Sequence, residues 1–382
     1  MSLSRRAFVR IIGGTAVFAA VGVGLTRCDR MPAEAVAAWN GPPAGETEPR
    51  RRALSYALLA PNPHNTQAWI ADLREAGVVT LSIDKTRLLA ATDPWFRQIV
   101  VGCGAFLEVL RIAAAEAGYR TEMTLFPEGP WPAKEIGATP LARIAFVADA
   151  GVAKDPLFVQ VLKRRSVKIA YEDGRPIEDA HRAALAGAIE LPLQVATAAD
   201  EVATLRAIAK EAWLAEVATP RANKESADYF RIGADEIASH RDGLSFHGPF
   251  FWWAKRFGLF TAEKTLEPGS FAYQGAIDTG VAWAEQVWSF GWLTTPGGTR
   301  ADEIAAGRDY VRLNLKATEL GVAMAPLSQV LQEYPEMAGP QKRFLDFIKT
   351  PPGSIVQMFF RLGYADDVPP TPRRALDDLI RA

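Results

Sequence analysis

Residues 60–69 read Ala60-Pro61-Asn62-Pro63-His64-Asn65-Thr66-Gln67-Ala68-Trp69, the most specific stretch of this sequence. The two prolines fix the backbone and remove hydrogen-bond donors, so a helix predicted over 50–59 must end here and an extended turn must follow. Asn and Gln side chains carry both donors and acceptors, which suits the polar edge of a uracil-like ring. A turn whose asparagines only cap the backbone explains the same residues, so both interpretations stay open at this point.

Outward from this turn, the chain alternates between helical and strand patterns. Residues 69–83 read as a hairpin around Glu75-Ala76-Gly77. Helices are predicted over 99–118, 177–189, 201–217, 276–291 and 309–321, and strands over 121–126, 141–148, 191–196 and 354–362. Residues 155–168 begin as a helix, whereas residues 245–271 are irregular and aromatic. This mixture predicts the α+β class, with helices flanking the sheets.

Two of the predicted helices match each other in register. Gly104 and Gly118 are spaced as Gly307 and Gly321 are. The same register matches Leu110, Ala114 and Glu116 with Leu313, Ala317 and Glu319. Helices of similar composition produce a few such matches by chance, so the register alone leaves an internal duplication open.

Composition restricts the class of function. The 382 residues are enough for a sizeable core, and a net charge of −1 argues against nucleic acid as the partner, because phosphate backbones need a basic surface. Four histidines and two cysteines form no Cys/His cluster, so no metal site is predicted. Any redox chemistry must therefore be carried by an organic cofactor.

Residues 1–37 are predicted to be an export signal. Ser4-Arg5-Arg6-Ala7-Phe8-Val9-Arg10 precedes an apolar run over 11–26. The arginine pair followed by Phe resembles the twin-arginine (Tat) motif, which implies the Tat export machinery as a partner. The location would be periplasmic, or tethered to the outer face of the inner membrane. Ala33-Glu34-Ala35 and Ala35-Val36-Ala37 are candidate cleavage sites, while an uncleaved anchor and lipidation at Cys28 remain alternatives.

Two further segments concentrate positive charge. Arg164, Arg165, Ser166 and Lys168 place three cations and a hydroxyl within five residues, a set that suits a phosphate on a polyol chain. Near the C-terminus, Pro370-Thr371-Pro372-Arg373-Arg374 follows a predicted strand. A charge run of this kind is also typical of a solvated helix end or a basic tail.

Taken in this order, the segments resemble the signatures of the nitroreductase family, in its two-half, Acg-like branch. The 60–69 stretch is similar to A-P-S-x-x-N-x-Q-P-W, with Asn62 in place of Ser and Ala68 in place of Pro. Residues 164–168 resemble R-R-S-x-R/K, and residues 361–376 resemble the C-terminal signature, with Thr371 in place of a lysine. The loop over 322–328 is similar to the family loop that passes the reactive N5 of the flavin. The resemblance covers about residues 50–379.

This resemblance implies an FMN cofactor, with no metal and no side chain assigned as catalytic. Arg164, Ser166 and Lys168 would contact the flavin ring edge, ribityl chain or phosphate, and Arg373 would bind the phosphate. The full set of implied cofactor-binding residues is Pro61, Asn62, Pro63, His64, Asn65, Gln67, Arg164, Arg165, Ser166, Lys168, Leu327, Ser328, Arg373 and Arg374.

The motif count indicates a fused pseudo-dimer. Residues 38–150 contain the turn motif without an R-R-S segment, and residues 151–382 contain the R-R-S segment without a second turn motif. The resemblance implies the nitroreductase fold, a three-layer α-β-α arrangement with a mixed, mainly antiparallel sheet, fused from two halves around one flavin site. Residues 245–271 are a candidate lid. Both a monomer and a homodimer fit this count.

The implied function is an FMN-dependent oxidoreductase. It would take hydride from NAD(P)H, or electrons from another donor, and reduce a small aromatic acceptor of the nitroaromatic or quinone class in a ping-pong cycle. The alternative is an FMN-binding or FMN-sequestering protein with a lidded site and little turnover.

Overall fold

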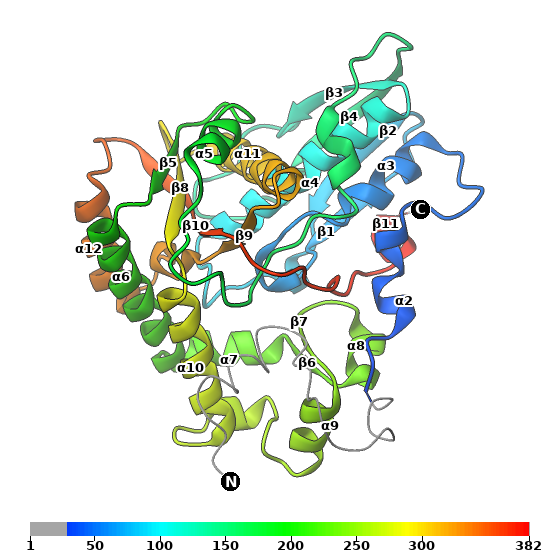
Figure 1. Cartoon of the computed structure of the whole chain (residues 1–382). Coiled ribbons are helices and arrows are strands. Elements are labelled where there is room, and N and C mark those ends of the chain that lie inside the picture. Colours follow the sequence, from blue (N-terminus) through cyan, green and yellow to red (C-terminus); the bar gives the residue numbers. More distant parts are fainter. Residues whose placement is uncertain (1–28, 382) are drawn as a thin grey trace.

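Two separate sheets organise the protein, whose computed structural model describes residues 29–381 (Figure 1). The arginine pair of the predicted export motif therefore lies outside the described residues. The first sheet has the strand order β11-β1-β2-β4-β3, formed by β1 (Trp69–Asp72), β2 (Val78–Ile83), β3 (Tyr119–Leu125), β4 (Ala142–Ala148) and β11 (Ile380–Arg381). The second has the order β5-β8-β10-β9, formed by β5 (Leu193–Ala196), β8 (Ser289–Thr295), β9 (Ala323–Pro326) and β10 (Ile355–Gly363).

The two sheets repeat one topology. In each, the first strand pairs with the second, and the last strand lies between the second and the third, with every pair antiparallel. A 20-residue helix joins the second strand to the third in both halves: α4 (Arg97–Glu116) and α11 (Arg300–Glu319). The C-terminal strand β11 then crosses to the first sheet and pairs with β1 in parallel. The chain is therefore an internal duplication, tied together by its C-terminus.

The helices α4 and α11 cross at a reciprocal glycine contact. A Cβ atom on Gly104 would lie 2.2 Å from the carbonyl oxygen of Ile304, and one on Gly307 would lie 1.9 Å from that of Val101. In the register that matches Gly104 with Gly307, Val101 matches Ile304. The two contacts are thus related as in a two-fold symmetric dimer, in which residue i meets residue j and j meets i.

The same reciprocity appears where the two helices begin. Arg97 is buried and donates from Nη1 to the carbonyl oxygen of Val356 at 3.0 Å, in the second half. Its counterpart Arg300 is also buried and donates from Nη2 to the carbonyl oxygen of Trp95 at 2.8 Å, in the first half. Each half therefore supplies an arginine that fastens the other half.

Helices surround the sheets in layers. Figure 1 shows α4 and α11 side by side between the two sheets, and α6 with α12 on the outer side of the second sheet. The first sheet carries helices on one face, and its edge strand β3 accordingly alternates between exposed and half-buried residues. The remaining helices of the layers are α3 (Pro49–Ala57), α5 (Asp179–Ala186), α6 (Ala199–Ala218), α10 (Phe271–Glu285) and α12 (Ala338–Ile348).

An inserted subdomain lies between α6 and α10. It consists of α7 (Pro220–Asp228), β6 (Phe230–Ile232), α8 (Ala234–His240), β7 (Leu244–Phe246) and α9 (Pro249–Arg256). Its apolar side chains form a small cluster of their own around Phe251 and Phe260. Short 3₁₀ helices complete the connections: η2 (Pro63–Asn65), η3 (Lys85–Arg87), η4 (Pro156–Gln160), η5 (Glu263–Leu266), η6 (Ser328–Leu331), η7 (Pro335–Met337) and η8 (Leu376–Asp378).

The N-terminal segment packs onto the body of the protein. It forms α2 (Ala33–Val36) and η1 (Ala37–Asn40), and the carbonyl oxygen of Ala35 accepts a hydrogen bond from the Arg373 backbone at 2.8 Å. Ala35 is fully buried. The predicted cleavage sites therefore fall within folded chain, while the boundary at residue 37 and the other domain limits stay predictions.

Most predicted elements appear, and the α+β class with two fused halves is confirmed. Three predictions are wrong. Residues 155–168 contain only the 3₁₀ helix η4, and residues 164–168 have no regular structure. The helix predicted over 276–291 ends at Glu285, and residues 289–291 begin β8. The segment 245–271 is not irregular, because it holds most of β7, all of α9 and η5.

Within residues 29–381, one helix is long and apolar enough to cross a membrane by length and composition. This is α4, with a mean hydropathy of 1.6, and 89% of the apolar window is buried inside the protein. Its apolar surface packs mainly against α11, α3 and the first sheet, so it is a core helix.

The glycine crossing predicts a large effect of a single methyl group. Gly307→Ala should destabilise the protein by about 1–3 kcal/mol or more, because the new Cβ meets the backbone of Val101, which cannot rotate away. Gly339→Ala, within α12, is the matched control and should be neutral or stabilising, because its Cβ meets only the flexible end of Arg343. Chemical denaturation measures both. Equal stability of the two variants would contradict the close crossing.

Candidate functional site

The turn after α3 has an unusual backbone. His64, Asn65 and Gln67 have φ angles of 47°, 53° and 51°, a left-handed conformation that non-glycine residues adopt rarely. Gly102 of α4 allows the turn to lie against the helix, since a Cβ there would be 3.3 Å from Asn62 and from Pro63. Asn62 holds the turn closed by accepting from the Gln67 backbone at 2.9 Å. Strain of this kind persists where the surrounding structure fixes it, and it occurs often at functional sites.

The turn joins the C-terminal segment directly. Asn65 Oδ1 accepts from Arg373 Nη1 at 2.8 Å, and Asn65 Nδ2 donates to the Pro372 carbonyl at 3.0 Å. Gln67 Oε1 accepts from the Arg374 backbone at 2.8 Å. The fold therefore brings together two motifs that lie at opposite ends of the sequence. The side-chain amides of Asn65 and Gln67 thus link the turn to the C-terminal segment.

Three buried or half-buried arginines meet at this junction. Arg164 and Arg373 both donate to the carbonyl oxygen of Leu59, at 2.7 and 3.3 Å. Arg164 also donates to Asn314 Oδ1 of α11 at 2.9 Å, and Asn314 Nδ2 donates to the Arg165 carbonyl at 3.2 Å. The first half, the central helix of the second half and the C-terminus thus all contribute to this arginine cluster, defined as Arg164, Arg165 and Arg373.

Within residues 29–381, no carboxylate forms an ion pair with the arginine cluster, although the charge of Asp367 acts on Arg165. The hydrogen bonds of its guanidinium groups go to carbonyl oxygens and to neutral side chains. Burial, and then the charge of Arg165, lowers the pKa of Arg164 to about 10. Burial, Arg164 and Arg165 together lower the pKa of Arg373 well below its usual value. Nε of Arg165 is buried without a partner. Cations gathered in this way favour an anion between them.

The N-terminal segment covers the arginine cluster with an aromatic ring. The Trp39 ring centroid lies 4.2 Å from the guanidinium carbon of Arg165, 5.2 Å from that of Arg373 and 5.6 Å from that of Arg164. The indole Nε1 donates to the Thr371 carbonyl at 2.8 Å. Cation–π contacts of this kind partly offset the repulsion among the guanidinium groups.

Lys168 has an exposed side chain. The protein atoms packed around its ammonium group are nevertheless the main cause that lowers its pKa, followed by the charge of Arg361. Nζ lies 5.7 Å from the Trp283 ring centroid, and the indole Nε1 of Trp283 is buried without a partner. A cofactor group with polar edges would satisfy such atoms.

A chain of polar side chains runs beside Lys168. His64 Nε2 and Ser226 Oγ are 2.9 Å apart, and Ser226 in turn hydrogen-bonds the carboxylate of Glu216. Glu216 accepts from Gln332 Nε2 at 2.7 Å, and Tyr334 donates to Gln332 Oε1 at 2.8 Å. The chain connects the strained turn, α6, α7 and the loop after β9.

Two members of this chain of polar side chains, His64 and Glu216, have pKa values far from their usual ones. Burial, assisted by the charge of Lys168, lowers the pKa of His64 to about 4, so His64 is neutral at pH 7. Burial raises the pKa of Glu216 to about 7, while Gln332 and Lys168 oppose the shift and Glu225 adds to it. A buried carboxyl that titrates near neutrality, beside a lysine, is typical of functional sites.

The side chains of Leu327, Ser328 and Arg374, which were predicted to bind the cofactor, contact other parts of the fold. Leu327 is buried in the core of the second half, and Ser328 Oγ donates to the Phe359 carbonyl at 2.8 Å, so both side chains serve the sheet. Arg374 turns away from the arginine cluster and donates to the carbonyl oxygens of Gln67 and Asp378. Pro61, Pro63 and Ser166 are half-buried next to the residues just described. Their binding roles stay predictions.

Glu216, Asn314 and Trp39 were missed by sequence reasoning. A glutamate or asparagine inside a helical pattern reads as a surface residue, and only tertiary packing buries Glu216 and Asn314. Trp39 falls in the linker that follows the predicted signal segment. No signal in the sequence separates it from other tryptophans.

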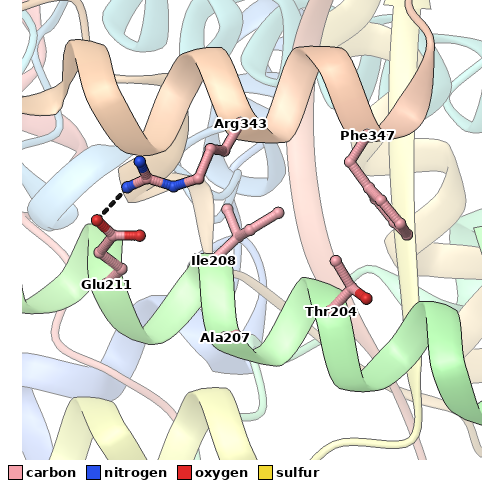
Figure 2. Close-up of a pocket in the computed structure, with 6 residues that line it drawn as sticks. All are labelled: Thr204, Ala207, Ile208, Glu211, Arg343 and Phe347. Carbon is pink, nitrogen blue, oxygen red and sulfur yellow. Dashed lines mark hydrogen bonds and ion pairs between the residues drawn. The ribbon is translucent and has the colours of Figure 1, made fainter.

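Two surface cavities lie away from these residues. One, of about 380 Å³, is lined by Thr204, Ala207, Ile208, Glu211, Arg343 and Phe347. Figure 2 shows that it is a groove between α6 and α12, crossed by an ion pair between Arg343 and Glu211. The other, of about 580 Å³, borders Arg52, Tyr56 and Glu116. Neither contains a residue of the arginine cluster or of the polar chain, so neither is the candidate site. Within residues 29–381, no group of three His, Cys, Asp or Glu side chains is placed to hold a metal ion.

Comparison with known proteins gives relatives along nearly the whole chain. No protein-family model matches it. The chain is 24% identical over 349 residues to an uncharacterized protein of Mycobacterium tuberculosis, covering 87% of this chain and 92% of the relative. It is 25% identical over 352 residues to a protein of the same organism provisionally named the NAD(P)H nitroreductase acg, covering 87% of this chain and 95% of the relative. The chain is thus similar to proteins assigned as nitroreductases.

Solved structures give weaker likenesses. A nitroreductase-like family protein from Bacillus cereus matches with a TM-score of 0.31 and 12% identity, over 58% of this chain and 92% of that chain. The FMN-dependent nitroreductase NfnB from Mycobacterium smegmatis, solved with NADPH, matches with a TM-score of 0.34 and 18% identity, over 58% of this chain and 96% of that chain. Structural similarity at this level does not by itself assign the chain to a family.

The pKa of Glu216 predicts a pH-dependent stability. The folded state, with a Glu216 pKa of about 7, binds the proton more tightly than the unfolded chain, in which the carboxyl pKa is 4.5. Stability is therefore lost as pH rises through the window between these two values. Glu216→Gln removes this titration, so its unfolding free energy should fall less across the window, by on the order of 1–3 kcal/mol. Urea denaturation at several pH values measures it, and identical slopes for both proteins would contradict the buried, titrating carboxyl.

Proposed function

We propose that this protein is an FMN-dependent NAD(P)H oxidoreductase with one composite cofactor site that uses both halves of the chain. The arginine cluster carries the proposal. Three guanidinium groups converge around Leu59 and Trp39 without an ion-paired carboxylate among residues 29–381, and within that range one of their donors is buried without a hydrogen-bond partner. Its position agrees with the motifs of the family resemblance, and the relatives named as nitroreductases support the class.

The residues present fit the two ends of FMN. Arg164, Arg165 and Arg373 would hold the phosphate, because a dianion would balance three neighbouring cations that repel one another. Lys168, whose Nζ lies beside the Trp283 ring, would lie toward the polar edge of the ring system. The strained turn with His64 and Asn65 borders both groups, since Asn65 bonds Arg373 and the charge of Lys168 acts on His64.

The redox chemistry is supplied by FMN when bound, which accepts hydride from NAD(P)H and passes electrons to an acceptor. The chain's own residues provide charge, hydrogen bonds and exclusion of water. Lys168 contributes a fixed positive charge, and Glu216 holds or releases a proton near neutral pH at its carboxyl. His64 stays neutral and donates or accepts toward Ser226. No side chain is assigned as catalytic. A nitroaromatic or quinone-like compound is the proposed acceptor class, and another donor would replace NAD(P)H where that is scarce.

A second candidate is an FMN-holding protein with little turnover. It is favoured by the attachment of the inserted subdomain to the turn motif. Asn65 and Gln67 both hydrogen-bond the loop over 241–243, at the base of the candidate lid. A lid fastened to the cofactor site would restrict access of a nicotinamide.

The cellular location and the oligomeric state are also proposals. The leader sequence supports Tat export, with a periplasmic or membrane-tethered protein. The paired motifs and the reciprocal α4–α11 contact support a monomer in which the two halves replace two subunits.

The absorption spectrum of the purified protein tests the function. Flavin bands are expected, and they should bleach when NADPH is added without oxygen. Bands that persist after NADPH, but bleach with dithionite, would favour the FMN-holding protein. Protein that has no bands and binds no added FMN would contradict both candidates.

Arg373 and Arg374 form a matched pair for cofactor binding. Arg373→Ala removes one member of the arginine cluster, and a charge-assisted contact is worth about 1.5–3 kcal/mol, so FMN affinity should fall roughly tenfold to a hundredfold. Arg374→Ala, which removes hydrogen bonds to the carbonyl oxygens of Gln67 and Asp378 and leaves the arginine cluster intact, should change affinity much less. Fluorescence titration with FMN gives both values. The reverse order of effects would place the phosphate beside Arg374 and refute the assignment.

A further inference from the structure

The inserted subdomain presents an exposed aromatic face. Trp253 is 39% exposed, Phe257 67% and Leu259 50%, and together they define this aromatic face. Phe271, 38% exposed, lies close to it in the chain. Most of the large exposed hydrophobic side chains within residues 29–381 belong to this short stretch. An apolar surface concentrated in this way marks an interaction site more often than scattered exposed residues do.

The aromatic face is additional to the packing that holds the subdomain together. The inward residues of this stretch, Phe251, Ala254 and Phe260, are buried in the subdomain's own cluster. Trp253 and Phe257 point the other way and stack on each other, with ring centroids 5.5 Å apart. The helix α9 therefore already has a buried side, and the aromatic face is a second apolar side that no other part of residues 29–381 covers.

Basic residues accompany the aromatic face. Lys255 and Arg256 are exposed and lie between Trp253 and Phe257, at the C-terminal end of α9. The guanidinium carbon of Arg256 lies 5.4 Å from the Trp252 ring centroid, while Lys255 pairs with Glu236. Tryptophan, phenylalanine and leucine next to Lys and Arg is the composition of helices that lie in the interface of a lipid bilayer with anionic headgroups.

The described chain begins beside this helix. Gly248, which immediately precedes α9, donates to the Asp29 carboxylate and to its carbonyl oxygen, both at 2.9 Å. The Asp29 carboxylate also accepts from the backbone of Ala234, which begins α8. Residues 1–28, with their apolar run over 11–26, therefore join the folded body at the N-terminal end of α9. Ala35 is buried, so the segment that makes this junction belongs to the fold.

We propose that the aromatic face of α9 docks on the surface of a lipid bilayer. The attachment point of residues 1–28 is the observation that selects a membrane over a second protein copy. A chain held in the bilayer by that apolar run would leave it beside Trp253 and Phe257. The aromatic side chains would then enter the headgroup region, with Arg256 near the lipid phosphates. This inference does not depend on the bound cofactor.

The test uses the full chain with vesicles of phosphatidylethanolamine and phosphatidylglycerol that carry brominated acyl chains. Tryptophan quenching by bromine and deuterium uptake of residues 249–260 are measured with and without vesicles. The leader is present in every variant, so the ratio of vesicle affinities reports the aromatic face alone. The double variant Trp253→Ser with Phe257→Ser should lose the quenching and bind about tenfold or more weakly. Trp95→Ser, at another exposed tryptophan, is the matched control and should behave as the wild type.

Arg256→Glu keeps the apolar side chains and tests the charge. It should weaken binding to vesicles with phosphatidylglycerol and leave binding to phosphatidylcholine vesicles unchanged. Unchanged quenching in the double variant, with its circular dichroism intact, would overturn the proposal. Protection of residues 249–260 that rises with protein concentration and not with vesicles would overturn it in favour of a second copy. Protection that follows added FMN and not vesicles would overturn it in favour of a lid.

Discussion

The close crossing of α4 and α11 is the contact on which the rest of the protein depends. Gly104 and Gly307 let two helix backbones approach to a distance that any side chain would prevent. Because the contact is reciprocal, Ile304 packs in the core of the first half and Val101 in the core of the second. Each half thus completes the other, and neither sheet is buried by its own helices alone. The crossing also sets where the segments before and after each central helix can meet.

The arginine cluster is a consequence of that arrangement. Arg164 lies in the second half, the Leu59 carbonyl in the first, and Arg373 reaches both from the C-terminal extension that ends in β11. Burying three guanidinium groups together costs free energy, since each is desolvated and repels its neighbours. Backbone carbonyls and the Trp39 ring offset part of this cost. An anion would offset the remainder, and this is the physical basis of the proposed phosphate site.

The sequence predicted those parts of the fold whose local pattern is strong. The helix around Gly104, the hairpin at Gly77 and the strand ending at Leu362 all appear, because apolar spacing and turn residues agree there. β8 was missed because it is buried on both faces, and such a strand has no alternation to distinguish it from a helix. The helix predicted to begin at Asp155 does not form, because Asp155 and Pro156 start only a short 3₁₀ helix.

For the site, the sequence located the segments and not the directions of their side chains. Arg164, Arg373 and Asn65 meet as their motifs suggested, whereas Ser328 and Arg374 turn toward backbone carbonyls. Those directions depend on contacts between residues far apart in the chain, which no local pattern encodes. For the same reason, the sequence did not predict the roles of Glu216 and Asn314, which become buried only when the two halves pack.

The central claim is that one chain, without a partner, forms a single composite cofactor site. Light scattering combined with flavin quantification tests it most directly, on dilute protein saturated with FMN and separated from free cofactor. The account predicts a monomer that retains one FMN per chain, because both halves of the site are already joined through α4 and α11. Two FMN per chain would contradict the single site. Loss of flavin in step with dissociation of a dimer would contradict the fusion.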